Sequence, residues 1–138
     1  MRNMISELKV EHSFEQILSR VVNLGLNKPF TAKQLEQTPP VIHPLVRTHP
    51  ETGRKVLFLS PGFTTRIIGM TEKESRALLL LLEDHATQPQ FVYRHSWKPN
   101  DIVFWDNRSL MHYAVADYDH ETVRRHMHRT TIRGEVPS

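Results

Sequence analysis

Apolar residues spaced three and four positions apart predict an amphipathic helix near the start of the chain. The spaced residues are Phe14, Ile17, Leu18, Val21 and Leu24. Ser13 and Gln16 stand three apart just before them, as in a capping box, and Gly25 is placed to end the helix. The sequence therefore predicts one helix between Ser13 and Gly25.

Two further capping boxes mark helix starts. Thr31-x-x-Gln34 precedes two prolines at 39 and 40, which cannot continue a helix, so only a short helix is expected there. Thr71-x-x-Glu74 leads into the longest apolar run of the chain, residues 77–82, and Thr87-Gln88-Pro89 ends it. We expect this helix to cover one face of a sheet.

Short β-like runs predict strands in the rest of the chain. Residues 45–48 and 55–59 flank the turn Pro50-Glu51-Thr52-Gly53 and predict a hairpin. Three later runs, separated by turns at 98–101 and 106–107, also predict strands: 91–97, 102–105 and 122–133. Strands are therefore expected to dominate the second half.

Composition indicates one globular domain. The chain has 138 residues, of which 38% are hydrophobic and 24% charged. The two prolines divide it into a helical N-terminal segment, 1–40, and a region 41–138. With no Cys, disulfides and thiolate metal sites are excluded, so any metal needs His and carboxylates. No apolar stretch is long enough to span a membrane and no signal peptide is evident, so we expect a cytoplasmic protein without a membrane partner.

The charge is concentrated near the C-terminus. The net charge of +3 is too small for a dedicated nucleic-acid binder, yet four Arg and three His lie between residues 120 and 133. If residues 122–133 form a strand, Arg125 and Arg129 share a face with Met127 between them, about 13 Å apart. Their guanidinium groups could hold two different anions, or they could be solvated or paired with acidic residues at 117, 119 and 121. Both interpretations stay open.

Histidine supplies the other candidate chemistry. His112 follows a predicted strand and turn, where it could be a ligand or an ordinary loop or core histidine, and no His-x-x-x-His supports a zinc site. His49-Pro50-Glu51 has the His-x-carboxylate spacing of some iron sites, but it lies in the predicted hairpin turn and is interpreted as a coincidence. No Gly-rich phosphate loop and no Gly-x-Ser-x-Gly elbow occurs.

An ordered set of motifs resembles the taurine dioxygenase family of non-haem Fe(II), 2-oxoglutarate-dependent oxygenases, which includes the 2,4-dichlorophenoxyacetate dioxygenases. The motifs are His43-Pro44-Leu45-Val46-Arg47-Thr48-His49-Pro50, Gly53-Arg54-Lys55, Gly62-Phe63-Thr64-Thr65-Arg66-Ile67, Trp105-Asp106-Asn107-Arg108, His112-Tyr113-Ala114, Asp117-Tyr118 and Met127-His128-Arg129. The resemblance is close over residues 41–138 and looser over 1–40, where Glu11-His12-Ser13-Phe14 carries it.

The resemblance implies a fold that is mainly β with flanking helices, a double-stranded β-helix or jelly roll, incomplete in this chain. It also implies roles for five residues. His112 is similar to the family's distal iron ligand, Arg125 to the arginine that binds the far carboxylate of 2-oxoglutarate, and Arg129 to the one that binds the substrate sulfonate. Phe14 and Phe63 are similar to aromatics of the substrate pocket, with ordinary core packing as the alternative.

One departure from the family concerns the metal. The family's other two iron ligands come from a His-x-Asp motif, and no His-x-Asp occurs in this chain. The implied activity is hydroxylation of taurine or a related alkylsulfonate with Fe(II), 2-oxoglutarate and O2, which releases sulfite. This chain alone is expected to be inactive, and no residue is assigned a catalytic role. The alternative is a truncated, non-catalytic remnant or partner module that keeps the anion-binding arginines; a homo-oligomer or a missing upstream half is also expected.

Overall fold

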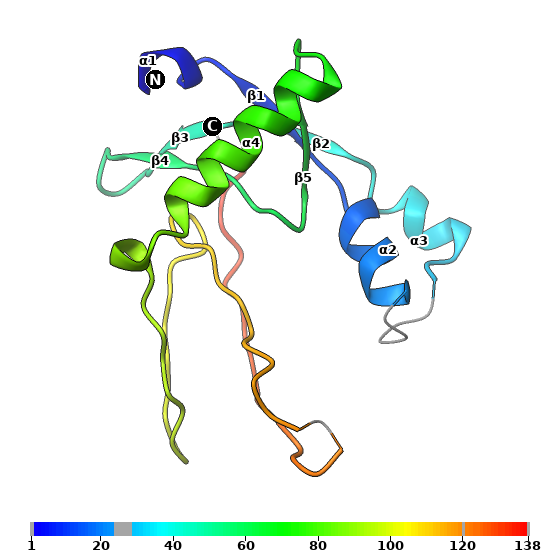
Figure 1. Cartoon of the computed structure of the whole chain (residues 1–138), viewed down its shortest axis with the longest axis vertical. Helices are drawn as coiled ribbons and strands as arrows, with labels where there is room; N and C mark the ends of the chain where they lie inside the picture. The colour runs from blue at the N-terminus through cyan, green and yellow to red at the C-terminus, as the bar shows by residue number, and fades with distance from the viewer. Residues whose placement is uncertain (1, 24–28, 120, 138) are drawn as a thin grey trace.

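The computed structural model describes residues 2–23, 29–119 and 121–137. Helices and strands are confined to the first two thirds of the chain (Figure 1). In chain order they are α1 (Arg2–Ile5), β1 (Lys9–His12), α2 (Glu15–Asn23), α3 (Ala32–Glu36), β2 (Val41–Pro44), β3 (Val46–Thr48), β4 (Lys55–Leu57), β5 (Thr64–Ile67), α4 (Glu72–Ala86) and the 3₁₀ helix η1 (Pro89–Phe91).

Two small antiparallel sheets form the body. β1 lies between β2 and β5, with Val10 opposite both His43 and Ile67, and a bulge interrupts the β1–β5 register between Glu11 and His12. β3 and β4 form the predicted hairpin, with Arg47 opposite Val56. In its turn, Gly53 has a φ of +67°, a conformation that favours glycine, so the hairpin prediction is confirmed together with its turn residue.

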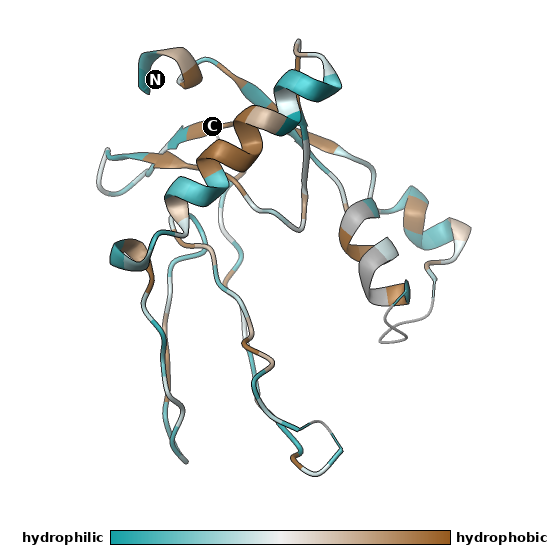
Figure 2. Cartoon of the chain, in the orientation of Figure 1, coloured by the Kyte–Doolittle hydropathy of each residue, from teal (hydrophilic) through white to brown (hydrophobic). Residues whose placement is uncertain are grey.

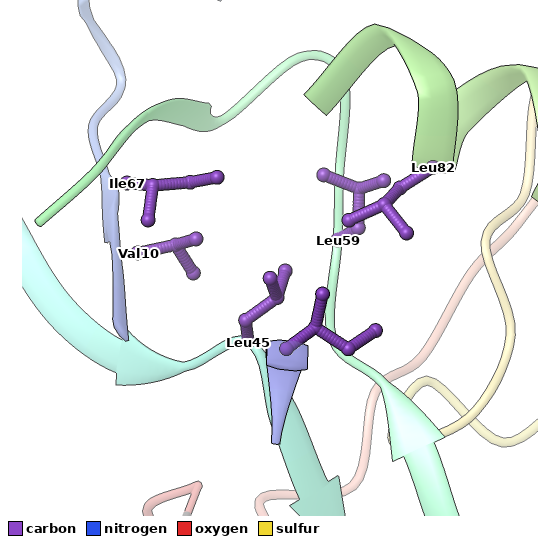
Figure 3. Packing of buried hydrophobic residues seen from close by; sticks show 6 residues of the cluster. Val10, Leu45, Leu59, Ile67 and Leu82 are labelled. Carbon is purple, nitrogen blue, oxygen red and sulfur yellow. The ribbon is translucent and has the colours of Figure 1, made fainter. Parts of the chain in front are cut away.

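The core lies between the sheets and α4, which crosses them diagonally (Figure 1). Val10 and Ile67 pack on one side of Leu45, and Leu59 and Leu82 on the other (Figure 3). Because Ser75 of α4 is buried and its Oγ accepts a 2.7 Å hydrogen bond from the Ile67 amide, a polar contact also fixes the helix to β5.

The three predicted helices are all present. α3 and α4 each begin with a complete capping box, at Thr31 and Thr71 respectively. At the start of α2, the Ser13 hydroxyl accepts a hydrogen bond from the Glu15 amide. The predicted stop at Gly25 lies outside the described residues.

The strands predicted at 91–97, 102–105 and 122–133 are wrong. Residues 92–105, and residues 110–119 with 121–133, instead form two long excursions that leave the body and return, and these described residues have no strand pairing (Figure 1). Apart from the described turn bonds, such as Asp101 N–H to Lys98 and Val123 N–H to Asp119, their backbones have no backbone hydrogen-bonded partners within the described residues. Alternating apolar and polar residues favour an extended backbone, but a β-strand also needs a second strand to which it is hydrogen-bonded. Among the described residues these segments have no such strand.

The N-terminal segment is not helical throughout. It contributes β1, the middle strand of the larger sheet, which the helical expectation for residues 1–40 lacks. The boundary between 1–40 and 41–138 stays a prediction. None of the described helices is long and apolar enough to cross a membrane.

Candidate functional site

Phe14 and Phe63 meet at the mouth of a pocket of about 350 Å³. Their ring centroids are 5.2 Å apart at 82°, an edge-to-face contact, and the Ser13 amide donates a 2.8 Å hydrogen bond to the Phe63 carbonyl. Gly62, next to Phe63, packs closely on α2, since a Cβ there would stand 3.3 Å from Cδ1 of Ile17. The two candidate aromatics thus line one pocket, whose other lining residues are His12, Ser13, Gln37, Thr38, Pro39, Val41 and His43.

Two imidazoles, His12 and His43, form another part of the pocket wall. Their centroids are 5.4 Å apart, and the Phe58 ring stacks on His12 at 5.3 Å and 12°. Burial lowers the pKa of both histidines, and the neighbouring Arg47 charge further lowers that of His43. Both rings are therefore neutral near pH 7 and present an uncharged wall.

His12 is held in a fixed orientation. Nε2 lies 3.2 Å from Oγ1 of Thr64, and that hydroxyl oxygen accepts a 3.0 Å hydrogen bond from the Ser60 amide. Since the Thr64 oxygen already accepts, its proton is free to be donated to His12 Nε2. Nδ1 of His43, by contrast, is buried without a hydrogen-bond partner among the described residues.

A second cluster joins the hairpin turn to the Trp105-Asp106-Asn107-Arg108 turn. Nε2 of buried His49 lies 2.9 Å from Oδ2 of Asp106, while its Nδ1 accepts from the amides of Glu51 and Thr52, both at 3.3 Å. Nδ1 is therefore the acceptor, so Nε2 carries the proton that is donated to Asp106. The contact spans 57 positions of sequence. Sequence reasoning missed it, although both turns belong to the motifs that carry the family resemblance.

Arg108 completes this cluster. Its guanidinium binds both carboxylate oxygens of Asp106 at 2.9–3.1 Å and reaches Glu51 at 3.0 Å. These hydrogen bonds, with that of His49, hold the pKa of Asp106 well below its usual range, and Asp106 raises the pKa of Arg108. Because the nitrogens of His49 and the oxygens of Asp106 are all engaged, the cluster is a structural clamp rather than a ligand set. The interpretation of His49-Pro50-Glu51 as a turn agrees with this.

His112 lies in the second excursion, outside the pocket lining. It is exposed, and its ring stands 5.0 Å from that of Trp105, whose Nε1 donates a 2.8 Å hydrogen bond to Asn107. Within the described chain, no hydrogen bond or ion pair joins His112 to a carboxylate or to another histidine.

Arg125 and Arg129 are exposed on the returning half of that excursion. Two of the three acidic residues considered as partners are engaged elsewhere: Asp117 pairs with Arg94, and Asp119 accepts a hydrogen bond from the Thr122 hydroxyl. Neither arginine forms an ion pair among the described residues, so the structure leaves both guanidinium groups to solvent. Their common face, which depended on a strand, stays a prediction.

The candidate residues thus lie in three places: the pocket at Phe14 and Phe63, the exposed His112, and the exposed arginines. No group of three or more His, Asp or Glu residues that could hold a metal occurs in the described ranges. The donors present do not fit an iron centre, since one imidazole is well short of the ligands that such a site needs.

Comparison with known proteins identifies the family. A profile of the "Taurine catabolism dioxygenase TauD, TfdA family" matches residues 1–131. An alpha-ketoglutarate-dependent 2,4-dichlorophenoxyacetate dioxygenase of Burkholderia sp. (strain RASC) is 47% identical over 105 residues, which cover 76% of this chain and 34% of that protein. A putative alpha-ketoglutarate-dependent sulfonate dioxygenase of Schizosaccharomyces pombe (strain 972 / ATCC 24843) is 48% identical over 96 residues, which cover 69% of this chain and 24% of that protein.

Solved structures agree. The crystal structure of AAD-2 in complex with Mn(II) and N-oxalylglycine is 44% identical, with a TM-score of 0.64 over 78% of this chain and 41% of that chain. This chain spans a quarter to a third of the length of the two curated relatives above. A match over residues 1–131, with these identities, shows that the chain belongs to the TauD, TfdA family of alpha-ketoglutarate-dependent dioxygenases.

Proposed function

We propose that this chain is part of an Fe(II)/2-oxoglutarate-dependent dioxygenase that acts on taurine or a related alkylsulfonate and releases sulfite. The proposed fold of the enzyme is a double-stranded β-helix, of which this chain forms a part. The family match over residues 1–131 carries the proposal. Because the described donors do not complete an iron site, the proposed contribution of this chain is anion binding together with one candidate iron ligand. By itself it is expected to be inactive.

The proposed roles divide by chemistry. Arg125 binds the far carboxylate of 2-oxoglutarate and Arg129 the sulfonate, because a guanidinium fork matches either anion with two charge-assisted hydrogen bonds. Exposure of both arginines without an ion pair supports this, since neither needs to release an internal partner first. His112 is the candidate for one iron ligand, the others coming from outside the described residues.

The aromatic pocket is proposed to hold the apolar part of the substrate. Phe14 and Phe63 give it an edge-to-face aromatic wall, and the uncharged His12 and His43 add no charge to this part of the pocket.

Binding by calorimetry tests the division between the arginines. We expect Arg129→Ala to weaken taurine binding about tenfold or more while sparing 2-oxoglutarate, and Arg125→Ala to do the reverse, since a charged hydrogen-bonded contact contributes about 1.5–3 kcal/mol. Arg124→Ala, next to Arg125 in sequence, is the matched control. Equal loss of both ligands in Arg129→Ala would refute the assignment.

A non-catalytic anion-binding module is the second candidate, and the lack of a three-ligand cluster among the described residues favours it. Anaerobic Fe(II) titration with 2-oxoglutarate, followed by O2 and a succinate assay with taurine, separates the two. Stoichiometric iron binding with taurine-dependent succinate supports the dioxygenase. Anion binding without iron binding or succinate supports the module.

A further inference from the structure

Buried and half-buried side chains alternate along residues 45–49, that is, along β3 and the residue on each side of it. The buried positions are Leu45, Arg47 and His49, so one face carries an apolar residue, a cation and an imidazole in succession. Leu45 belongs to the core, as expected of such a face. The two polar residues are unusual there, because Arg is almost never fully buried unless it is paired.

Arg47 is only 3% exposed, and its guanidinium lies 5.4 Å from the centre of the Phe58 ring. Its carboxylate contact is with Glu135, 88 positions later, where Nη2 and Oε1 are 3.5 Å apart. Nε has no hydrogen-bond partner among the described residues. A buried guanidinium is stabilised by a carboxylate, and among the described residues Glu135 supplies one, through a single nitrogen, Nη2.

His49, two residues further on, binds a second carboxylate from the distant part of the chain, that of Asp106. The two acids bracket one segment: Asp106 stands at its start and Glu135 at its end. Between them lies the second excursion, which runs out from the body and returns to end beside β3 (Figure 1).

We propose that Arg47, on β3, and His49, directly after it, each bind a carboxylate and together hold the segment that runs from Asp106 to Glu135 at both ends. The Arg47–Glu135 pair fixes the returning half, on which Arg125 and Arg129 lie, and the His49–Asp106 pair fixes the outgoing half, on which His112 lies. Arg47 and Glu135 are positioning residues: they act through the arginines and do not contact the anions themselves. Their effect on anion binding rests on the function proposed above for Arg125.

This arrangement follows from the backbone. Among the described residues the excursion has no strand partner that would fix its position. Contacts with the body at its two ends are therefore what position it. A contact at one end leaves the other free to swing, whereas contacts at both ends convert the segment into a closed loop with far fewer conformations. Anion binding by two arginines in the loop then requires less ordering.

The experiment uses the full chain labelled with ¹⁵N. The Arg47 Nη2–Hη resonance, identified by its loss in Arg47→Lys, reports directly on the contact with Glu135. We expect Glu135→Gln to shift it and to speed exchange of the Nη2 protons with water about tenfold, because the charge of the hydrogen-bond acceptor is lost. Glu121→Gln is the matched control, since it removes an exposed acid of the same segment.

Calorimetry then asks whether the pair positions the anion site. We expect Glu135→Gln and Arg47→Met each to weaken 2-oxoglutarate binding about threefold to tenfold, and the double variant to be no weaker than either single variant, because both break one contact. Glu121→Gln should bind as the wild type does.

Two results overturn the proposal: an Arg47 resonance that Glu135→Gln leaves unchanged, or equal 2-oxoglutarate affinity in the wild type, Glu135→Gln and Arg47→Met. A wild-type chain that does not bind 2-oxoglutarate would instead reject the proposed function of Arg125. In that case the resonance alone decides whether β3 holds the end of the segment.

Discussion

Buried polar residues connect the parts of this molecule that the apolar core does not reach. Ser75 ties α4 to β5, and Thr64 ties the loop at Ser60 to His12. Both of these hydroxyl groups have specific partners, as expected where an unpaired buried group costs about 1–3 kcal/mol. Such contacts therefore fix single geometries, which non-directional apolar packing alone does not.

His12 and His43 make stability depend on pH. The pKa of each is lowered from its ordinary value of 6.5 by burial in the fold, whereas the unfolded chain keeps that value. As pH falls below about 6.5 the unfolded state binds more protons than the folded state. We expect the free energy of unfolding to decline from there until pH passes the folded pKa values, as measured by urea unfolding at a series of pH values.

The same series includes His12→Gln and His43→Gln. Each variant should flatten the decline, because it removes one group that resists protonation in the fold. The control is His126→Gln, which removes an imidazole from an exposed position and should keep the wild-type slope. Variants of His12 and His43 that both retain the full slope would show that the dependence arises elsewhere.

At the level of elements, the capping boxes at Thr31 and Thr71 have the same hydrogen bonds but different consequences. α4 contributes Ser75 and Leu82 to the buried interior, whereas α3 has no buried residue. Loss of the α4 cap should therefore loosen the core, while α3 can fray by itself.

We expect Thr71→Ala to lower the free energy of unfolding by about 1 kcal/mol, the usual cost of an N-cap. Thr31→Ala removes an identical cap and should change global stability by less than about 0.5 kcal/mol, as is typical of exposed positions. Denaturant unfolding followed by circular dichroism measures both. Equal losses in the two variants would mean that α3 unfolds together with the core.

Local signals explain which elements could be predicted. α2, α3 and α4 carry caps within a few residues, and the β3–β4 hairpin carries its own turn, so each is specified by neighbouring sequence. β1 was missed because its partners, β2 and β5, lie far along the chain: even the nearest pair, His12 and Val41, is 29 positions apart. For the excursions the error is the reverse, a predicted strand that is not formed. Alternating residue types at 122–133 predict a strand, but the described residues offer it no partner strand.

The candidate site divides in the same way. Phe14 and Phe63 were singled out by family resemblance, and the structure brings their rings together. The His49–Asp106 and Arg47–Glu135 contacts join residues that are 57 and 88 positions apart. A pattern within a short stretch of sequence cannot predict such pairs. Long-range polar contacts are specified by the fold, so they become visible only once the body is assembled.

At the scale of the whole molecule, the two excursions expose apolar residues and unpaired backbone. Brown apolar positions recur along both of them (Figure 2). Among the described residues of the excursions and the adjoining C-terminal residues, six large hydrophobic side chains are more than three-quarters exposed: Tyr93, Ile102, Phe104, Tyr113, Ile132 and Val136. Unpaired extended segments of this kind act as templates for pairing with another chain.

We therefore expect the isolated chain to self-associate through these segments as its concentration rises, which light scattering after size-exclusion chromatography measures. The double substitution Ile102→Lys/Phe104→Lys should reduce association, because exposed lysines oppose pairing at a strand edge. Leu35→Lys, on exposed α3, is the control and should leave association unchanged. A monomer at every concentration, with amide exchange as slow in residues 92–133 as in β1, would contradict the prediction. It would mean that the excursions are stabilised within one chain, as two arms joined by Arg94 and Asp117.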